Sequence, residues 1–389
     1  MKTKTTHLPH KSKALENRLR LPRFLRAALL VSVAVMMGSG AVASDEKKLS
    51  VYFVGNSLTA STTLDRVHNL FAQRGIDLQF GSQLSAGKSL LRHLNYAKEP
   101  DQKWMCWETS EKSGESFLPH PNFYVADPKT WRFGRYDTAL VSHKWDALVM
   151  QPYMSPIKDD MEAIPAFMEL ALKNGATDRF YLYQTWPRRP KVKPAQPAPG
   201  EKMGPDDGAA RDIDYAVEWT SAYTATIEQT DWKANQFCAS RDYFQKLLKM
   251  LGERFPDLKQ PIHLIPAGEV LFAIDAKIKA GALPGLKELA ERKPDMVPGA
   301  AGGFDPARGA NLLYVDPIHF NPMPHKNGVV GNLISGTTIF TVLSGENPVG
   351  LSAEAYGFDP EKDAALVKAI QETIWEVVTS EPATGVSKK

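Results

Sequence analysis

Two short segments, far apart in the sequence, hold the side chains that nucleophilic acyl transfer requires. Ser57 lies in the motif Gly-Asn-Ser-Leu, directly after the apolar run Leu49–Val54. Asp316 and His319 lie in the motif Asp-Pro-Ile-His, near the end of the chain. A histidine oriented by a carboxylate can take the proton of a serine hydroxyl, which activates the oxygen for attack on an acyl carbonyl. We therefore expect Ser57, His319 and Asp316 to meet in the folded protein.

Five apolar runs have the length and composition of β-strands: Leu49–Val54, Ile76–Gly81, Ala147–Gln151, Arg179–Gln184 and Pro261–Ile265. Their apolar residues are continuous rather than alternating, which is typical of parallel strands covered on both faces. Apolar residues at helical spacing fall between these runs, around residues 64–71, 164–171 and 243–251. This alternation predicts an α/β fold, a flavodoxin-like three-layer sandwich with a central five-stranded parallel sheet.

Ligands of such sheets bind at the carboxyl ends of the strands. Ser57, Gly87, Gln151 and Trp186 each follow or end one of the first four predicted strands. We therefore expect these residues to converge on one edge of the sheet, where a site would be formed.

The chain divides into a leader, one main domain and a C-terminal helix. The main α/β domain is expected over residues 44–350, with long loop insertions near 98–140, 187–211 and 284–312. A helix is expected over Asn327–Leu343. A last helix is expected from Asp359, as its cap, to Val378, and residues 351–389 would comprise this helix and a disordered tail from Thr384.

Residues 1–43 have the pattern of an export signal: a basic region, an apolar stretch and a small-residue motif ending at Ala43. We expect cleavage after Ala43 and a periplasmic or secreted protein; the alternative is an uncleaved anchor. Eight of the 47 Lys and Arg but one of the 44 Asp and Glu lie in this segment, which leaves residues 44–389 with a formal charge of −4. That charge balance gives no reason to expect a nucleic-acid partner. After cleavage of the signal, no association with a membrane is expected either.

The two cysteines, Cys106 and Cys238, could form a disulfide in an exported protein or remain two buried thiols. The histidines show no pairing with Cys or carboxylates at metal-ligand spacing, so neither a metal nor another cofactor is expected. Five aromatic residues could stack on sugar rings in a cleft or belong to the core: Trp104, Trp107, Trp131, Tyr153 and Trp186.

The motif around Ser57 resembles the serine block of the SGNH, or GDSL, hydrolases, and Asp316 to His319 resembles the Asp-x-x-His block of that family. The resemblance in order and spacing extends over most of residues 49–345. It implies that Ser57 is the nucleophile, His319 the general base and Asp316 the residue that orients the imidazole. It also implies an oxyanion hole formed by the N–H groups of Ser57 and Gly87.

This sequence departs from the family pattern at two positions. Asn56 replaces the aspartate of the serine block. Gln151 stands near the family's asparagine, the third oxyanion donor; its amide could donate the same hydrogen bond from one methylene further out, or the third donor could be missing or come from elsewhere. The expected function is an exported serine esterase acting through an acyl-enzyme on carboxylic esters, with O-acetyl groups on a polysaccharide as the substrate. The alternatives are a glycan-binding protein without activity on the same fold and an O-acyltransferase.

Overall fold

A computed structural model describes residues 47–96, 132–153, 155–188, 215–228, 239–316, 318–320 and 329–388. The predicted leader, both cysteines, and Trp104, Trp107 and Trp131 lie outside these residues. So do most of the expected insertions near 98–140 and 187–211.

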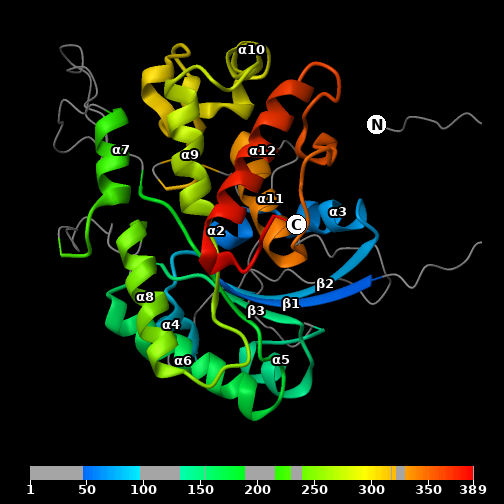
Figure 1. The fold of residues 1–389 in the computed structure, drawn as a ribbon, viewed down its shortest axis with the longest axis vertical. Helices are drawn as coiled ribbons and strands as arrows, with labels where there is room; N and C mark the ends of the chain where they lie inside the picture. The colour runs from blue at the N-terminus through cyan, green and yellow to red at the C-terminus, as the bar shows by residue number, and fades with distance from the viewer. Residues whose placement is uncertain are drawn as a thin grey trace, which may run out of the picture. The chain divides into compact units, whose positions relative to one another are not determined.

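The centre of the fold is a five-stranded parallel sheet with the strand order β2-β1-β3-β4-β5 (Figure 1). The strands are β1 Lys47–Gly55, β2 Ile76–Leu84, β3 Ala147–Met150, β4 Phe180–Tyr183 and β5 His263–Ile265. All five predicted strands are confirmed, and so is the α/β class. The first two are longer than predicted, because Lys47 pairs with Ile76 and Gly55 with Leu84 over nine residues each.

Helices cover both faces of this sheet, as Figure 1 shows. The α-helices are α2 Ser57–Ala60, α3 Leu64–Ala72, α4 Leu90–Leu94, α5 Tyr136–Ser142, α6 Ile157–Lys173, α7 Tyr215–Thr224, α8 Arg241–Arg254, α9 Ala267–Lys279, α10 Leu286–Arg292, α11 Val330–Ser344 and α12 Ala364–Ser380. Short 3-10 helices are η6 Pro294–Met296, η7 Pro298–Ala300, η8 Pro306–Leu313, η9 Glu354–Tyr356 and η10 Pro382–Thr384.

Successive residues of each strand enter two separate cores, which explains the continuous apolar runs in the sequence. In β1, Val51 and Phe53 pack with α3, α9, α11 and α12 on one face. Tyr52 and Val54 pack with α5, α6 and α8 on the other face. Both faces are therefore covered, and the polar ends of the strands remain as the places where a site can form.

Helix α11 is buried on every side between Val330 and Leu343, which is unusual for a helix that contains several hydroxyl side chains. Ser335, Thr338 and Thr341 satisfy their hydroxyl groups by donating to the carbonyl oxygen four residues earlier in the same helix. These hydrogen bonds allow a helix with several hydroxyl side chains to be fully buried next to the Ser57 turn.

The C-terminal third differs from the prediction in three places. The segment 284–312 is not an open loop, because Leu286 and Leu289 of α10 and Leu312 of η8 are buried in the core. Helix α12 begins at Ala364 rather than beside Asp359, whose carboxylate accepts instead from the N–H groups of the next turn. Thr384 does not begin a disordered tail: it is 2% exposed and its hydroxyl donates to the Val378 carbonyl.

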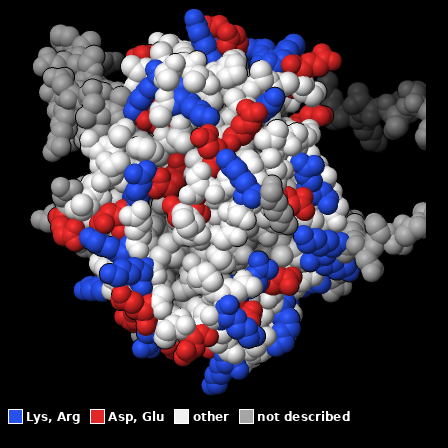
Figure 2. Space-filling model, in the orientation of Figure 1, with Lys and Arg blue, Asp and Glu red and all other residues white. Residues whose placement is uncertain are grey.

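Positive and negative side chains are interspersed over the face of the molecule shown in Figure 2. Several are paired: Lys246 of α8 contacts Glu228 at 2.7 Å and Asp242 of the same helix at 2.9 Å, and Arg254 contacts Glu169 of α6 at 3.1 Å. Among the described residues, no helix is long and apolar enough to cross a membrane.

Candidate active site

The first part of the site is the sharp turn where β1 ends and α2 begins. Asn56 has an extended backbone with φ of −133°, and its side chain caps α2 by accepting from the Leu58 N–H at 2.9 Å. The Asn56 amide also donates to the carbonyl of Lys88 at 3.2 Å. Ser57 is thereby the first residue of α2 and is 7% exposed.

Gln151, directly after β3, holds this turn by hydrogen bonds from its side chain. Its Oε1 accepts from the Asn56 N–H and from the Thr59 hydroxyl, each at 3.0 Å, and its Nε2 donates to the Pro152 carbonyl at 3.0 Å. The side chain is 1% exposed. A Cβ on Gly55 would lie 2.9 Å from the Gln151 Oε1 and 2.4 Å from the Thr59 hydroxyl, so only glycine fits there.

These contacts differ from the oxyanion donation expected of Gln151 from the sequence. The carbonyl oxygen of the amide is fixed by a backbone donor, which also fixes the direction of its nitrogen, toward Pro152. The extra methylene of glutamine places the amide under the turn that holds Ser57. Gln151 therefore holds the backbone of the Ser57 turn in place.

The second part of the site is the loop between η8 and α11 that carries Asp316 and His319. The two oxygens of Asp316 have separate partners. Oδ1 accepts from the N–H groups of Ile318 and His319, both at 2.8 Å, and so folds the loop. Oδ2 contacts the imidazole Nδ1 at 2.7 Å and so orients the ring.

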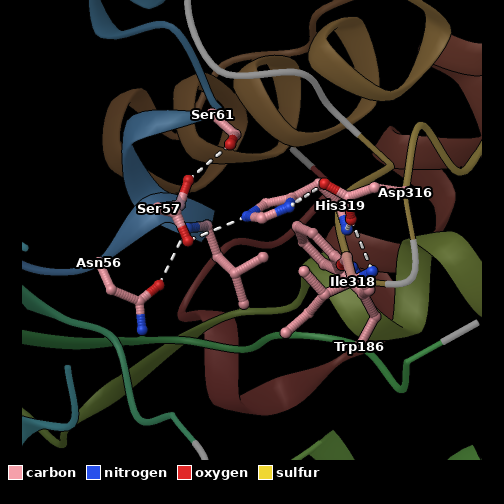
Figure 3. A network of polar contacts seen from close by, with 8 residues as sticks. Asn56, Ser57, Ser61, Trp186, Asp316, Ile318 and His319 are labelled. Carbon is pink, nitrogen blue, oxygen red and sulfur yellow. Dashed lines mark hydrogen bonds and ion pairs between the residues drawn. The ribbon is translucent and has the colours of Figure 1, made fainter. Parts of the chain in front are cut away.

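The two parts meet: His319 Nε2 lies 2.9 Å from Ser57 Oγ, although 262 positions separate the residues in the sequence. Figure 3 shows the three side chains in line, with the imidazole between the hydroxyl and the carboxylate. The contact of Asp316 with Nδ1 requires a proton on that nitrogen, which leaves Nε2 free to accept the serine proton. The arrangement expected from the sequence for Ser57, His319 and Asp316 is present in the structure.

The environment of Asp316 keeps its carboxylate charged. Desolvation by partial burial acts to raise its pKa, but hydrogen bonds from the His319 side chain and from the Ile318 and His319 N–H groups together lower the pKa to about 2. The carboxylate is thus ionised at neutral pH, and its charge can stabilise an imidazolium.

Gly87 lies in a turn held beside Ser57. The Lys88 N–H donates to the Ser85 carbonyl at 3.2 Å, and Gly87 has a φ of +67°, as the third residue of a type II β-turn requires. The Ser85 N–H donates to the Gly55 carbonyl, and Asn56 donates to the Lys88 carbonyl, so both ends of this turn are tied to the Ser57 turn. Within the described part of the chain, the N–H groups of Ser57 and Gly87 have no acceptor.

Two residues considered as sugar-stacking platforms are buried instead. Trp186 is 2% exposed and Tyr153 is 9% exposed, and both belong to the core. The indole N–H of Trp186 donates to the Ile318 carbonyl at 2.9 Å, within the histidine loop. The described residues contain no cluster of three or more His, Cys, Asp and Glu that could hold a metal ion.

Sequence reasoning missed the residues that hold the turn from α11. Asn332 Nδ2 donates to the Ser61 carbonyl at 2.5 Å and to the Thr63 hydroxyl at 3.3 Å. The Ser61 hydroxyl in turn donates to the Ser57 carbonyl at 2.5 Å. Thr63 has a φ of +61°, a conformation that non-glycine residues rarely adopt. Asn332, the one amide side chain among the apolar and hydroxyl residues of α11, was the signal in the sequence.

Comparison with known proteins identifies the fold. No protein-family model and no curated protein matches the sequence. The structure is similar to that of a DUF4886 family protein from Bacteroides uniformis ATCC 8492, with a TM-score of 0.51, 14% identity, and coverage of 85% of this chain and 95% of that chain. A "putative SGNH hydrolase" from Slackia heliotrinireducens also matches, with a TM-score of 0.34, 14% identity, and coverage of 76% of this chain and 98% of that chain. At such identities the first similarity shows the fold alone, and the second is too weak to support an inference about activity.

Proposed function

We propose that this protein is an exported serine hydrolase of the SGNH type that cleaves carboxylic esters through an acyl-enzyme. The observation that supports the proposal is the contact of Ser57 Oγ with His319 Nε2 at 2.9 Å, with Asp316 at 2.7 Å from the other ring nitrogen. The α/β fold by itself would not support this proposal, because many unrelated functions share the fold.

In the first half of the reaction, Ser57 Oγ attacks the acyl carbonyl carbon while His319 Nε2 takes the hydroxyl proton. The resulting imidazolium is stabilised by the charge of Asp316. The negative carbonyl oxygen would accept from the N–H groups of Ser57 and Gly87, which have no other acceptor in the described part of the chain. Collapse of the tetrahedral intermediate breaks the ester C–O bond, and the imidazolium gives its proton to the departing alkoxide.

In the second half, His319 Nε2 takes a proton from water, and the hydroxide attacks the carbonyl carbon of the acyl-enzyme. The Ser57 ester bond breaks, the proton returns to Ser57 Oγ, and the carboxylic acid leaves. Every proton in this cycle moves through one ring nitrogen, and no metal or organic cofactor is needed for the balance of the reaction.

For the substrate we propose an ester of a carbohydrate, such as an O-acetyl group on a polysaccharide. The support is the composition of residues 98–140, which contain eight aromatic residues, three of them Trp, and four Pro. The burial of Trp186 and Tyr153 removes both from this argument. The signal-like residues 1–43 support the proposal that the protein is exported, to the periplasm or beyond.

The test compares two ester classes with one variant. Purified wild-type protein should release acetate from an acetylated glycan such as acetylated xylan, and Ser57→Ala should release none above background. Rapid cleavage of long-chain lipid esters without release of acetate from any acetylated glycan would contradict the substrate class. Ester cleavage that persists in Ser57→Ala would contradict the mechanism.

A further inference from the structure

Two hydrogen bonds join the segment that follows β4 to the loop that carries the proposed base. The indole N–H of Trp186 donates to the Ile318 carbonyl at 2.9 Å. In the other direction, the Tyr314 hydroxyl donates to the Pro187 carbonyl. We call these four residues, Trp186, Pro187, Tyr314 and Ile318, the β4 clamp. Their two hydrogen bonds hold the loop at Tyr314 and at Ile318, on either side of Asp316.

The aromatic side chains at the clamp are buried. Trp186 is 2% exposed, and Tyr314 and Phe320 are fully buried. The ring of Phe320 packs against Trp186 with centroids 3.8 Å apart and against Tyr314 at 6.3 Å. The indole N–H of Trp219 donates to the Tyr314 hydroxyl at 2.9 Å, which fixes the direction in which that hydroxyl donates. Hydrogen bonds in such surroundings are costly to break, since the freed groups cannot turn to water.

The clamp acts on the peptide unit next to the imidazole. The Ile318 carbonyl and the His319 N–H belong to one planar peptide group. Trp186 holds its oxygen, and Asp316 Oδ1 holds its N–H at 2.8 Å. With both ends fixed, the plane cannot rotate, and the His319 Cα is held at a set distance from Ser57. Figure 3 shows Trp186 beside Ile318, next to the loop that carries Asp316 and His319.

We propose that Trp186 is a positioning residue for the proposed hydrolysis. Through the Ile318 carbonyl it keeps His319 Nε2 at 2.9 Å from Ser57 Oγ. This inference rests on the proposed function, since it assigns Trp186 a part in activating the serine. A displacement of about 1 Å at a reacting group can reduce a rate by about 100-fold, so a change at a buried indole that touches no substrate should be visible in catalysis.

The test uses Trp186→Phe, which removes the N–H and retains an aromatic ring. Trp145→Phe is the matched control, because the indole N–H of Trp145 donates to the Ala139 carbonyl at 3.0 Å and the side chain is 4% exposed. Trp145 packs in the core on the other face of the sheet. We expect Trp186→Phe to lower kcat and the rate of Ser57 labelling by a fluorophosphonate by about 10- to 100-fold with KM unchanged.

Trp145→Phe should lower the Tm by a similar amount and leave kcat and the labelling rate unchanged. Tyr314→Phe, which removes only a hydroxyl, should lower kcat and the labelling rate as Trp186→Phe does. It provides a second test if Trp186→Phe does not fold. Equal kcat values and labelling rates in Trp186→Phe, Tyr314→Phe and Trp145→Phe would overturn the clamp.

A spectroscopic measurement judges the clamp even if the protein hydrolyses no ester. In the wild type, the Nδ1 proton between His319 and Asp316 should give a downfield NMR resonance that exchanges slowly. We expect this resonance to broaden or disappear in Trp186→Phe and to persist in Trp145→Phe. Its persistence unchanged in Trp186→Phe would overturn the clamp, whereas absence of Ser57 labelling in the folded wild type would overturn the proposed function instead.

Discussion

The serine and the histidine of the site are held by two regions that are built differently. Residues 55–63 around Ser57 are buried, and their positions depend on backbone hydrogen bonds and on amides from Gln151 and Asn332. The loop around His319 is more open: the side chains of His319 and Asp316 are 15% and 45% exposed. Its conformation depends on the Asp316 carboxylate, on the N–H groups of Val315 and Asp316 that donate to the His319 carbonyl at 2.8 and 3.4 Å, and on the β4 clamp. The difference suggests that changes at the serine turn will reduce folding stability, whereas changes in the histidine loop will mainly reduce activity.

The largest effect on activity is expected in the histidine loop. His319→Ala removes the proposed general base and should lower kcat by about 10⁵-fold, while the Tm changes little because the imidazole is partly exposed. Steady-state kinetics and thermal unfolding of the same preparation measure both. A variant that keeps more than a tenth of the wild-type kcat would show that His319 is not the base.

Asp316→Asn should lower kcat by about 10³- to 10⁴-fold. The amide oxygen of the substituted side chain can still accept from the backbone N–H groups that fold the loop, but the amide nitrogen cannot accept the imidazole Nδ1 proton. The loop should therefore keep its conformation while the imidazole loses its orientation and its charge partner. A normal circular dichroism spectrum and Tm together with a kcat close to that of the wild type would contradict the separate roles of the two oxygens.

Gln151→Leu tests the opposite region, where stability should suffer. It leaves the Asn56 N–H and the Thr59 hydroxyl without their buried acceptor, which should cost roughly 2–3 kcal/mol in the free energy of unfolding. Since the turn carries Ser57, kcat should fall as well. Urea unfolding and kinetics measure the two effects.

Gln371→Leu is the matched control. Gln371 of α12 is also 1% exposed; its amide accepts from the Gly350 N–H at 3.0 Å and donates to the Leu351 carbonyl at 2.8 Å, both in the loop after α11. This variant should lose a similar free energy of unfolding and keep kcat. A loss of kcat in both variants would show that the effect of Gln151→Leu is merely one of stability.

The smallest expected effect is on the pH dependence of folding stability. It distinguishes Asp316, in the site, from Asp160, a buried carboxyl group elsewhere in the fold. The pKa of Asp160 on α6 is raised to about 7, chiefly by desolvation on burial. The hydrogen bond from the Tyr243 hydroxyl lowers this pKa by a smaller amount, and the charge of Asp159 raises it slightly. The folded state therefore holds this proton more tightly than the unfolded state, whose Asp pKa is about 3.9. Stability from Asp160 is complete below about pH 4 and should decrease by roughly 2 kcal/mol between pH 5 and pH 7.

Asp160→Asn should remove this slope from the free energy of unfolding measured against pH. Asp316 has the opposite sign: its pKa is lowered to about 2, so its contribution is present above about pH 4 and is lost as the pH falls toward 2. Asp316→Asn should therefore leave the slope between pH 5 and 7 as it is. The same slope in Asp160→Asn and in the wild type would contradict the assignment to Asp160.

The sequence was sufficient to predict the sheet, because apolar runs buried on both faces have a distinct composition. It also identified Ser57, Asp316 and His319, since residue type and place at a strand end are local properties. The position of Gln151 was predicted, but its contacts were not, because the direction of an amide depends on the partners that the fold brings to it.

Other parts of the structure depend on contacts that no local pattern indicates. Asn332 lies 271 residues from the Ser61 carbonyl that it binds, and Trp186 lies 132 residues from Ile318. The start of α12 at Ala364 was missed because Asp359 and Pro360 have the composition of a helix start but form a preceding turn. Burial of Leu286 and Leu289 shows that glycine and proline nearby do not by themselves make a segment a loop.

The central claim is that His319 activates Ser57 as a nucleophile, and a fluorophosphonate adduct mapped by mass spectrometry tests it most directly. We predict a single adduct on the peptide that contains Ser57 in the folded wild-type protein, no adduct in Ser57→Ala, and labelling slowed by orders of magnitude in His319→Ala. An unlabelled but folded wild-type protein, or an adduct on another residue that survives in Ser57→Ala, would contradict the claim.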